Sequence, residues 1–175
     1  WETFEAQAPH AHMVLPILDG RLLRKQPAKA LLDGAGRNVD IIVGSNAQEF
    51  AVDAPVEPLR HYVTESFGGQ AEQALAYYFP DGAARASDPL LGNAGTQLVD
   101  DLRFRCPSLL AARAADVAWV YHFEQPRSGE SVAAHSHELV YVFGNWGPEW
   151  PLKQPMSPGE LALLDQMQSY WANFA

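Results

Sequence analysis

The sequence contains little cysteine and little positive charge. Its 175 residues include one cysteine, Cys106, which excludes an internal disulfide framework and a zinc site built from several cysteines. Lys and Arg number 12 against 21 Asp and Glu, a formal net charge of −9. Because nucleic acids and anionic membranes are polyanionic, we expect neither as a partner. No apolar run approaches the roughly 20 residues of a membrane-spanning helix.

The remaining composition fits one globular unit. Hydrophobic residues make up 47% of the chain and charged residues 19%, which is enough apolar material for a sizeable core. We therefore take residues 1–175 as a single segment. The chain begins at Trp1 without an initiator methionine or a signal-peptide pattern, and it ends inside a predicted helix. We expect it to be a piece of a longer protein, and the sequence assigns no compartment.

Two short apolar runs predict strands. Residues 39–43 are rich in β-branched side chains and are followed by Gly44, and residues 117–123 form a similar run. Helical patterns fill most of the chain between them, and a loop and a helix follow the second run. This order predicts an α/β fold. Since two strands are few for such a sheet, we expect its other central strands to precede Trp1.

Three helices have clear signals. Two are expected over residues 89–104 and 107–115, the second opened by Pro107, whose missing N–H costs nothing in a first turn. The last begins after Ser157, with Glu160 at the spacing of a capping box. Five apolar residues of this last helix recur at helical intervals and are expected to face the core: Leu161, Leu164, Met167, Trp171 and Phe174.

A candidate carboxylate follows the first strand. Residues 44–49 read Gly-Ser-Asn-Ala-Gln-Glu, and open α/β sheets carry functional side chains on loops at the carboxyl ends of their strands. A carboxylate there can orient a histidine through one ring nitrogen and stabilise the imidazolium formed in catalysis. Glu49 is therefore a candidate orienting acid, and the alternative is a solvated surface glutamate.

Two histidines, His135 and His137, lie at i and i+2. As a general base, one of them needs only an orienting acid and a nucleophile. Alternate side chains of a strand project together, so the pair could instead chelate a metal, helped by Glu138 and by the histidines of residues 10–12. No third ligand follows at a recognisable spacing, and we expect neither a metal nor another cofactor.

Two candidate nucleophiles are poor matches. Residues 129–133 read Gly-Glu-Ser-Val-Ala, close to the nucleophile elbow Gly-x-Ser-x-Gly, in which a strand runs directly into the serine. Residues 124–128 separate this segment from the preceding strand, so we expect Ser131 to be a loop residue. Cys106 precedes a proline with no histidine nearby in sequence, and a core or half-buried thiol is expected.

Taken in order, several segments resemble the C-terminal part of type-B carboxylesterases, the family that includes the cholinesterases. The resemblance implies the C-terminal part of an α/β-hydrolase fold, with few strands and many helices. The segments that carry it are Pro-Ile-Leu-Asp-Gly at 16–20, the strand and loop at 41–49, Phe-Arg-Cys-Pro-Ser at 104–108, the strand at 120–123, the histidine loop at 133–145 and the helix at 167–175.

The resemblance implies catalytic roles for two residues. The family pattern Gly-Ala-x-His-x-x-Glu matches His135 rather than His137, with Glu138 as its structural glutamate. His135 is then the general base and Glu49 its orienting acid, in the chain order expected of α/β-hydrolases. The implied activity is that of a serine carboxylesterase acting on a small-molecule ester. Its nucleophilic serine and oxyanion loop would lie upstream of Trp1, so this chain alone is expected to be inactive.

Some positions depart from the family. Phe50 stands where a glycine usually follows the acid, and we expect it to crowd the wall of the site. Val132 replaces the first glycine of the histidine motif. Cys106 matches a position that is disulfide-bonded in some relatives, but its partner would fall beyond Ala175, so a free thiol is expected.

Two functions from other classes remain as alternatives. One is a non-catalytic, cholinesterase-like adhesion module, and the other is a small metal-binding protein built on His135 and His137. The expected partner within the same domain is its missing N-terminal part. Without that part, apolar surface is expected to be exposed and to favour self-association.

Overall fold

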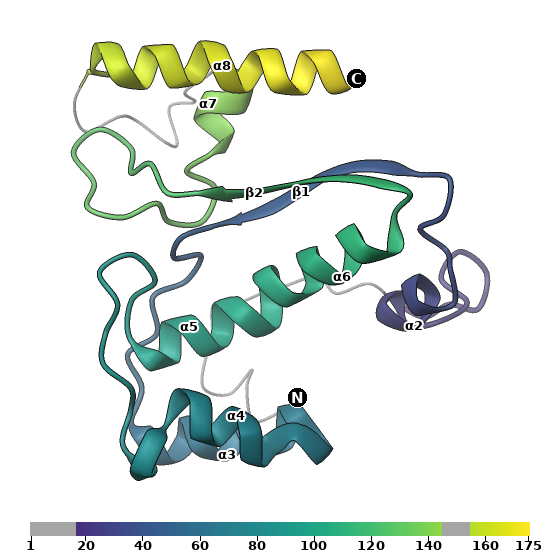
Figure 1. Ribbon diagram of the computed structural model, residues 1–175, viewed down its shortest axis with the longest axis vertical. Coiled ribbons are helices and arrows are strands. Elements are labelled where there is room, and N and C mark those ends of the chain that lie inside the picture. The colour runs from purple at the N-terminus through teal and green to yellow at the C-terminus, as the bar shows by residue number, and fades with distance from the viewer. Residues whose placement is uncertain (1–16, 145–154) are drawn as a thin grey trace.

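Two parallel strands lie between helices on both faces (Figure 1). In the computed structural model, β1 (Asp40–Asn46) and β2 (Val117–Phe123) pair along their whole length. α6 (Cys106–Ala114) packs on one face of the pair, and α8 (Pro158–Phe174) lies over the other through aromatic contacts. Both predicted strands are confirmed, and the layering is that of an α/β fold.

The structure describes residues 17–144 and 155–175. The histidines of residues 10–12 lie outside this part of the chain. The other elements are, in order, α2 (Pro27–Leu32), α3 (Val56–Phe67), η1 (Gly68–Gln70), α4 (Ala71–Tyr78), η2 (Pro80–Gly82), α5 (Ala94–Asp100), η3 (Asp101–Arg105) and α7 (Leu139–Phe143).

β1 continues to Asn46 instead of ending at Gly44 as the sequence predicts. Gly44 lies opposite Tyr121 of β2, and a Cβ at this position would collide with the carbonyl oxygen and the ring of Tyr121. The glycine is therefore a close-packing residue inside the strand rather than a strand terminator. The longer strand carries the chain directly into the loop that contains Glu49.

The two helices predicted over residues 89–104 and 107–115 are present but are joined into one helical stretch. α5 begins at Ala94, where the side chain of Asn93 accepts the Thr96 N–H at 2.9 Å, and it continues through η3 into α6. η3 is a π-turn, and it lies just before Pro107. A proline in a regular helix removes one hydrogen bond and clashes with the carbonyl four residues earlier, whereas here the chain passes Pro107 with its helical direction kept.

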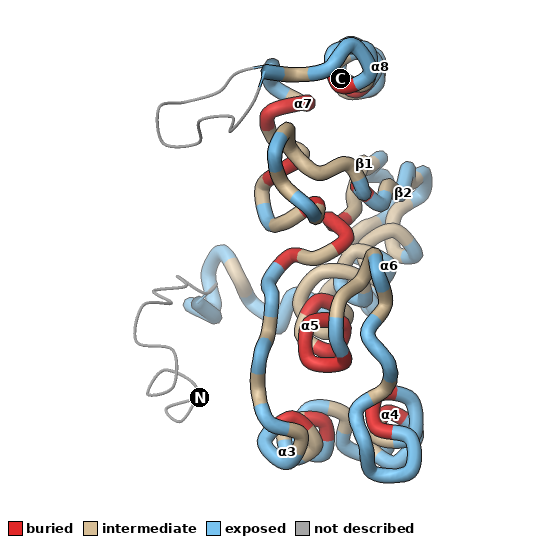
Figure 2. Tube along the Cα trace, turned by 90° about the vertical axis from the view of Figure 1, so that its left-hand side faces the viewer, coloured by how far each residue is buried: buried red, intermediate tan, exposed pale blue. Residues whose placement is uncertain are grey.

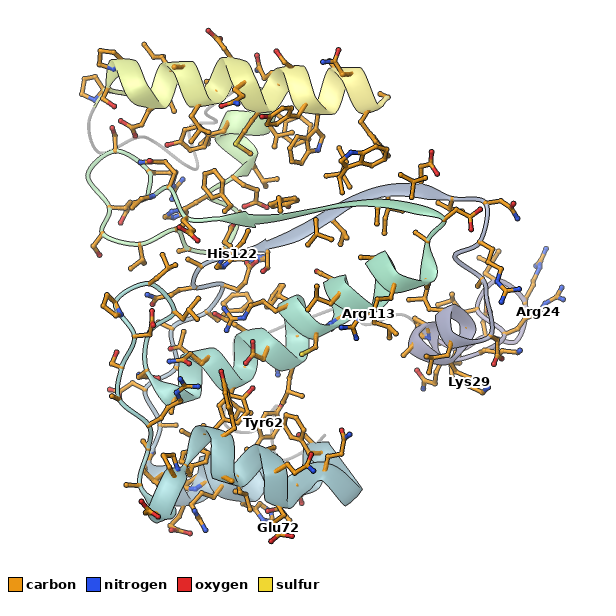
Figure 3. All side chains as sticks on the ribbon, viewed as in Figure 1. Arg24, Lys29, Tyr62, Glu72, Arg113 and His122 are labelled. Atoms are coloured by element: carbon orange, nitrogen blue, oxygen red, sulfur yellow. The ribbon has the colours of Figure 1, made fainter. Side chains whose placement is uncertain are left out.

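Buried apolar side chains form two clusters. Figure 2 shows buried positions in α3, α4 and α5 and again around α7. The first joins α3 and α4 to α5, and partly buried Tyr62, labelled in Figure 3, packs against it. The second joins the carboxyl ends of the strands to α7 and α8. The first contains Leu59, Val63, Ala74, Tyr78, Phe79, Ala94 and Leu98; the second contains Ala47, Phe123, Ala133, Val140, Tyr141 and Met167.

α8 begins with the predicted capping box and buries most of the predicted face. Ser157 Oγ accepts the Glu160 N–H at 3.3 Å, and the Glu160 carboxylate accepts the Ser157 N–H at 2.8 Å. Glu160 is buried and also accepts from the hydroxyl of Tyr141 at 3.3 Å. Of the predicted core residues, Met167 is buried and Leu164 and Trp171 pack against the second cluster, whereas Leu161 and Phe174 are exposed.

Apolar side chains remain exposed on the sheet. Trp119 is 52% exposed and Val120 53% exposed. A groove of about 500 Å³ lies between β2 and the end of α8, lined by aromatic rings that include Trp171 and Phe174. This agrees with the expected exposure of apolar surface, and self-association stays a prediction. In the described part of the chain no helix is both long and apolar enough to cross a membrane.

Candidate active site

The loop after β1 and the loop before α7 are joined by backbone hydrogen bonds. The Gln48 N–H donates to the carbonyl of Ala133 at 3.0 Å, and the His135 N–H donates to the carbonyl of Glu49 at 3.2 Å. These bonds hold two segments far apart in sequence in one fixed register. The two predicted catalytic residues are thereby brought together at the carboxyl ends of the strands, where α/β folds place their active sites.

Glu49 and His135 form a hydrogen-bonded pair. The Glu49 Oε2 atom lies 2.7 Å from His135 Nδ1, and its other oxygen accepts the Asn46 N–H at 2.7 Å. The glutamate side chain is 6% exposed and the histidine side chain 48% exposed. Because a carboxylate only accepts hydrogen bonds, Nδ1 carries the proton, and Nε2 is left with the lone pair that a general base needs.

Asn46 holds the histidine loop through hydrogen bonds from its side chain. Its buried side-chain amide donates to the carbonyl of Ala134 at 2.7 Å and also to the carboxylate of Glu138. Both acceptors flank His135 in sequence. Glu138 therefore contacts the loop through Asn46, and the structural role that the family resemblance implies for it stays a prediction.

Comparison with known proteins gives matches over most of the chain. The model of the carboxylesterase family matches residues 1–175. The chain belongs to the carboxylesterase family. It is 31% identical over 179 residues to a fumonisin B1 esterase of Sphingopyxis macrogoltabida and 27% identical over 173 residues to the para-nitrobenzyl esterase of Bacillus subtilis. Each alignment covers 91% of this chain but only 32% and 34% of the relatives, so the chain spans about a third of their length.

A solved structure gives the same result. The structure of a PNB esterase superposes with a TM-score of 0.71 at 27% sequence identity, covering 91% of this chain and 34% of that one. PNB esterase has an α/β-hydrolase fold. The fold expected from the sequence, part of an α/β-hydrolase, is therefore confirmed for this carboxylesterase-family chain.

The two histidines of the His-x-His motif do not project together. Ser136 between them has a φ of 66°, in the left-handed region, so the chain turns instead of continuing as a strand. His135 is half-exposed, whereas His137 is buried. Among residues 17–144 and 155–175 no three His, Cys, Asp or Glu side chains gather as a metal site. The strand geometry on which a His-x-His chelate depends is thus missing from this motif.

Neither of the two weak nucleophile candidates, Ser131 and Cys106, lies on a nucleophile elbow. Ser131 is exposed in the loop that follows β2, as predicted. Cys106 is a free, exposed thiol at the start of α6, so the expectation of a core or half-buried thiol is wrong. Since α5 continues through η3 into α6, Cys106 sits on the outer side of a helix rather than in an interhelical junction.

Asp100 is a site residue that sequence reasoning missed. Its fully buried carboxylate accepts the Glu49 N–H at 2.9 Å and the Phe50 N–H at 3.1 Å. Burial raises the pKa of Asp100 to about 6, helped by the nearby charge of Glu49 and opposed by the two hydrogen bonds and by Arg105. Its only signal in the sequence is an acidic residue on the buried side of a helix.

Arg105 fixes the same loop from the π-turn. Its guanidinium donates to the carbonyl of Ala47 at 3.3 Å and to that of Gln97 at 3.2 Å, and it pairs with the Asp101 carboxylate at 2.6 Å. The loop that carries Glu49 is therefore held by two charged groups of one helical stretch, Asp100 at the end of α5 and Arg105 at the end of η3. Neither group is close to Glu49 in sequence.

The raised pKa of Asp100 predicts a pH-dependent stability. Since the folded pKa of about 6 exceeds the ordinary value of 3.8, the contribution of Asp100 is full below about pH 4 and is lost as the pH rises through 6. We expect the loss to be less than about 3 kcal/mol. Urea unfolding between pH 4 and 7 should show the free energy of unfolding falling more steeply for the native sequence than for Asp100→Asn, and parallel profiles would contradict this.

Proposed function

We propose that this chain carries the acid and base of a serine carboxylesterase. His135 acts as general base and Glu49 orients it, while the nucleophilic serine comes from outside residues 1–175. The observation that carries the proposal is the 2.7 Å contact between a buried Glu49 oxygen and His135 Nδ1 of a half-exposed ring. The relatives named above are esterases, which supports the same reaction class.

The proposed reaction is acyl transfer in two steps. His135 Nε2 takes the proton of the serine hydroxyl as the serine oxygen attacks the ester carbonyl, and then gives that proton to the departing alcohol. In the second step the same nitrogen takes a proton from water as the water attacks the acyl-enzyme, and it returns this proton to the serine oxygen as the ester bond to the serine breaks and the acid leaves. Glu49 holds the Nδ1–H throughout and stabilises the imidazolium that forms twice in the cycle. Backbone N–H groups outside this chain would bind the oxyanion.

Two partners follow from the proposal. The substrate is a small-molecule ester that reaches His135 at the solvent-exposed part of its ring. The rest of the same domain would cover the exposed sheet around Trp119 and Val120, both more than half exposed here. The Glu49–His135 pair favours the enzyme over a non-catalytic adhesion module, because binding a protein partner does not require a buried acid against a histidine.

Hydrolysis of a p-nitrophenyl ester tests the proposal. We expect turnover by the full-length protein that contains this chain and none by the 175-residue chain alone. Ser131→Ala in the full-length protein should leave kcat unchanged, because Ser131 is a loop residue. Turnover by the isolated chain that disappears with Ser131→Ala would contradict the proposal and make Ser131 the nucleophile.

A further inference from the structure

The ring of His135 makes two contacts besides its bond to Glu49. The Phe50 ring stacks on it, with centroids 4.7 Å apart and planes inclined at 30°. The Phe104 ring lies 5.5 Å away at 56°, and the two phenylalanine rings are themselves 5.6 Å apart. All three separations lie in the range of attractive aromatic pairs. The three rings thus form a closed group around the proposed base.

We propose that Phe50 is a positioning residue that sets the plane of the His135 imidazole, with Phe104 in contact with both rings. This inference rests on the proposed esterase function, because its kinetic consequence requires His135 to be the base. It assigns a role to the residue that stands where the family usually has glycine. The sequence predicts that Phe50 crowds the wall of the site, and the group that its ring contacts is His135 itself.

One hydrogen bond does not fix the direction in which His135 Nε2 points. The bond to Glu49 holds Nδ1, but small combined changes in χ1 and χ2 can still tilt the ring while that bond is kept. With its side chain 48% exposed, His135 has little other packing to prevent such a tilt. A flat contact on one face, given by Phe50, removes this freedom. Since displacements of about 1 Å in a reacting group can cost on the order of a hundredfold in rate, the tilt matters.

Phe50 and Phe104 are themselves held firmly. The Phe50 N–H donates to Asp100 Oδ1 at 3.1 Å, which fixes its backbone against α5. Phe104 lies on the π-turn η3, whose extra residue per turn changes the direction of the side chains that follow α5. Arg105, the next residue, is tied to the carbonyl of Ala47. Phe50 itself lies on the loop after β1, and this loop is tied to the helical stretch through Asp100 and Arg105.

Three substitutions at Phe50 separate the effect of its aromatic ring on His135 from the effect of its apolar volume. Phe50→Leu keeps apolar volume without an aromatic face, Phe50→Gly restores the usual family residue and removes both, and Phe50→Tyr keeps the ring. In the full-length protein we expect kcat to fall about tenfold with Leu and further with Gly, with KM within about twofold, and to stay near the native value with Tyr. Phe67→Leu is the control for a general loss of packing, because Phe67 packs against the first cluster, away from His135.

A spectroscopic readout accompanies the kinetics. With ¹³C-labelled histidine, the His135 ring protons should be shifted upfield by the Phe50 ring current in the native protein and in Phe50→Tyr, and should move downfield in Phe50→Leu. An unchanged resonance and kcat in Phe50→Leu would overturn the positioning role, and the esterase proposal would stand if His135→Ala were still inactive. Absence of ester hydrolysis by the native full-length protein would overturn both.

Discussion

Replacing His135 with alanine is expected to lower kcat for ester hydrolysis by on the order of 10⁴-fold or more. The variant keeps Glu49 and the loop backbone but has no group to take the serine proton or to protonate the leaving alcohol. KM should change little, since the imidazole acts in the transition state rather than in substrate binding. The measurement is p-nitrophenyl ester hydrolysis by the full-length protein near neutral pH.

His122 provides the matched control for this substitution. It is an exposed histidine near the carboxyl end of β2 (Figure 3), and its Nδ1 lies 3.4 Å from the exposed carboxylate of Glu124. His122→Ala should leave kcat within about twofold, as surface substitutions usually do. A His135→Ala variant that retained a tenth of the native activity would show that His135 is not the base.

Replacing Glu49 with glutamine is expected to lower kcat by on the order of 10³–10⁴-fold while the protein stays folded. The amide keeps the size of the side chain, but it no longer has two accepting oxygens. When its NH₂ faces His135, the ring must accept at Nδ1 and carry its proton at Nε2, which is the wrong tautomer for a general base. Loss of the carboxylate charge also removes the stabilisation of the imidazolium.

Glu124→Gln is the control for Glu49→Gln. It changes the same chemical group in a second Glu–His pair, that of Glu124 with His122. Both members of this pair face solvent. Exposed ion pairs contribute little, so kcat should not change measurably. Equal activities of Glu49→Gln and the native protein would remove Glu49 from the mechanism.

Local sequence patterns predicted the parts of the fold that depend on nearby residues. The β-branched runs gave both strands, and Ser157 with Glu160 gave the start of α8 through a capping box formed within one turn. The pairing of Glu49 with His135 was available only through the order of motifs along the chain, because their hydrogen bond spans 86 positions. Periodicity alone does not report such a contact.

The errors arose where tertiary contacts override local preference. Because glycine weakens strands, the sequence predicts a strand end at Gly44, but the ring of Tyr121 on the neighbouring strand requires a glycine there. Pro107 does stand in the first turn of α6, but local patterns do not predict that η3 joins α5 to this helix. Asp100 went unnoticed because its partners, the N–H groups of Glu49 and Phe50, lie about 50 positions away.

A double-mutant cycle on Glu49 and His135 tests most directly whether the acid works through the base. kcat/KM is measured for the native full-length protein, for Glu49→Gln, for His135→Ala and for the variant with both changes. If Glu49 acts only by orienting His135 and stabilising its imidazolium, the double variant should be no slower than His135→Ala alone. A further loss of tenfold or more in the double variant would show that Glu49 acts independently of His135, and the proposed dyad would be wrong.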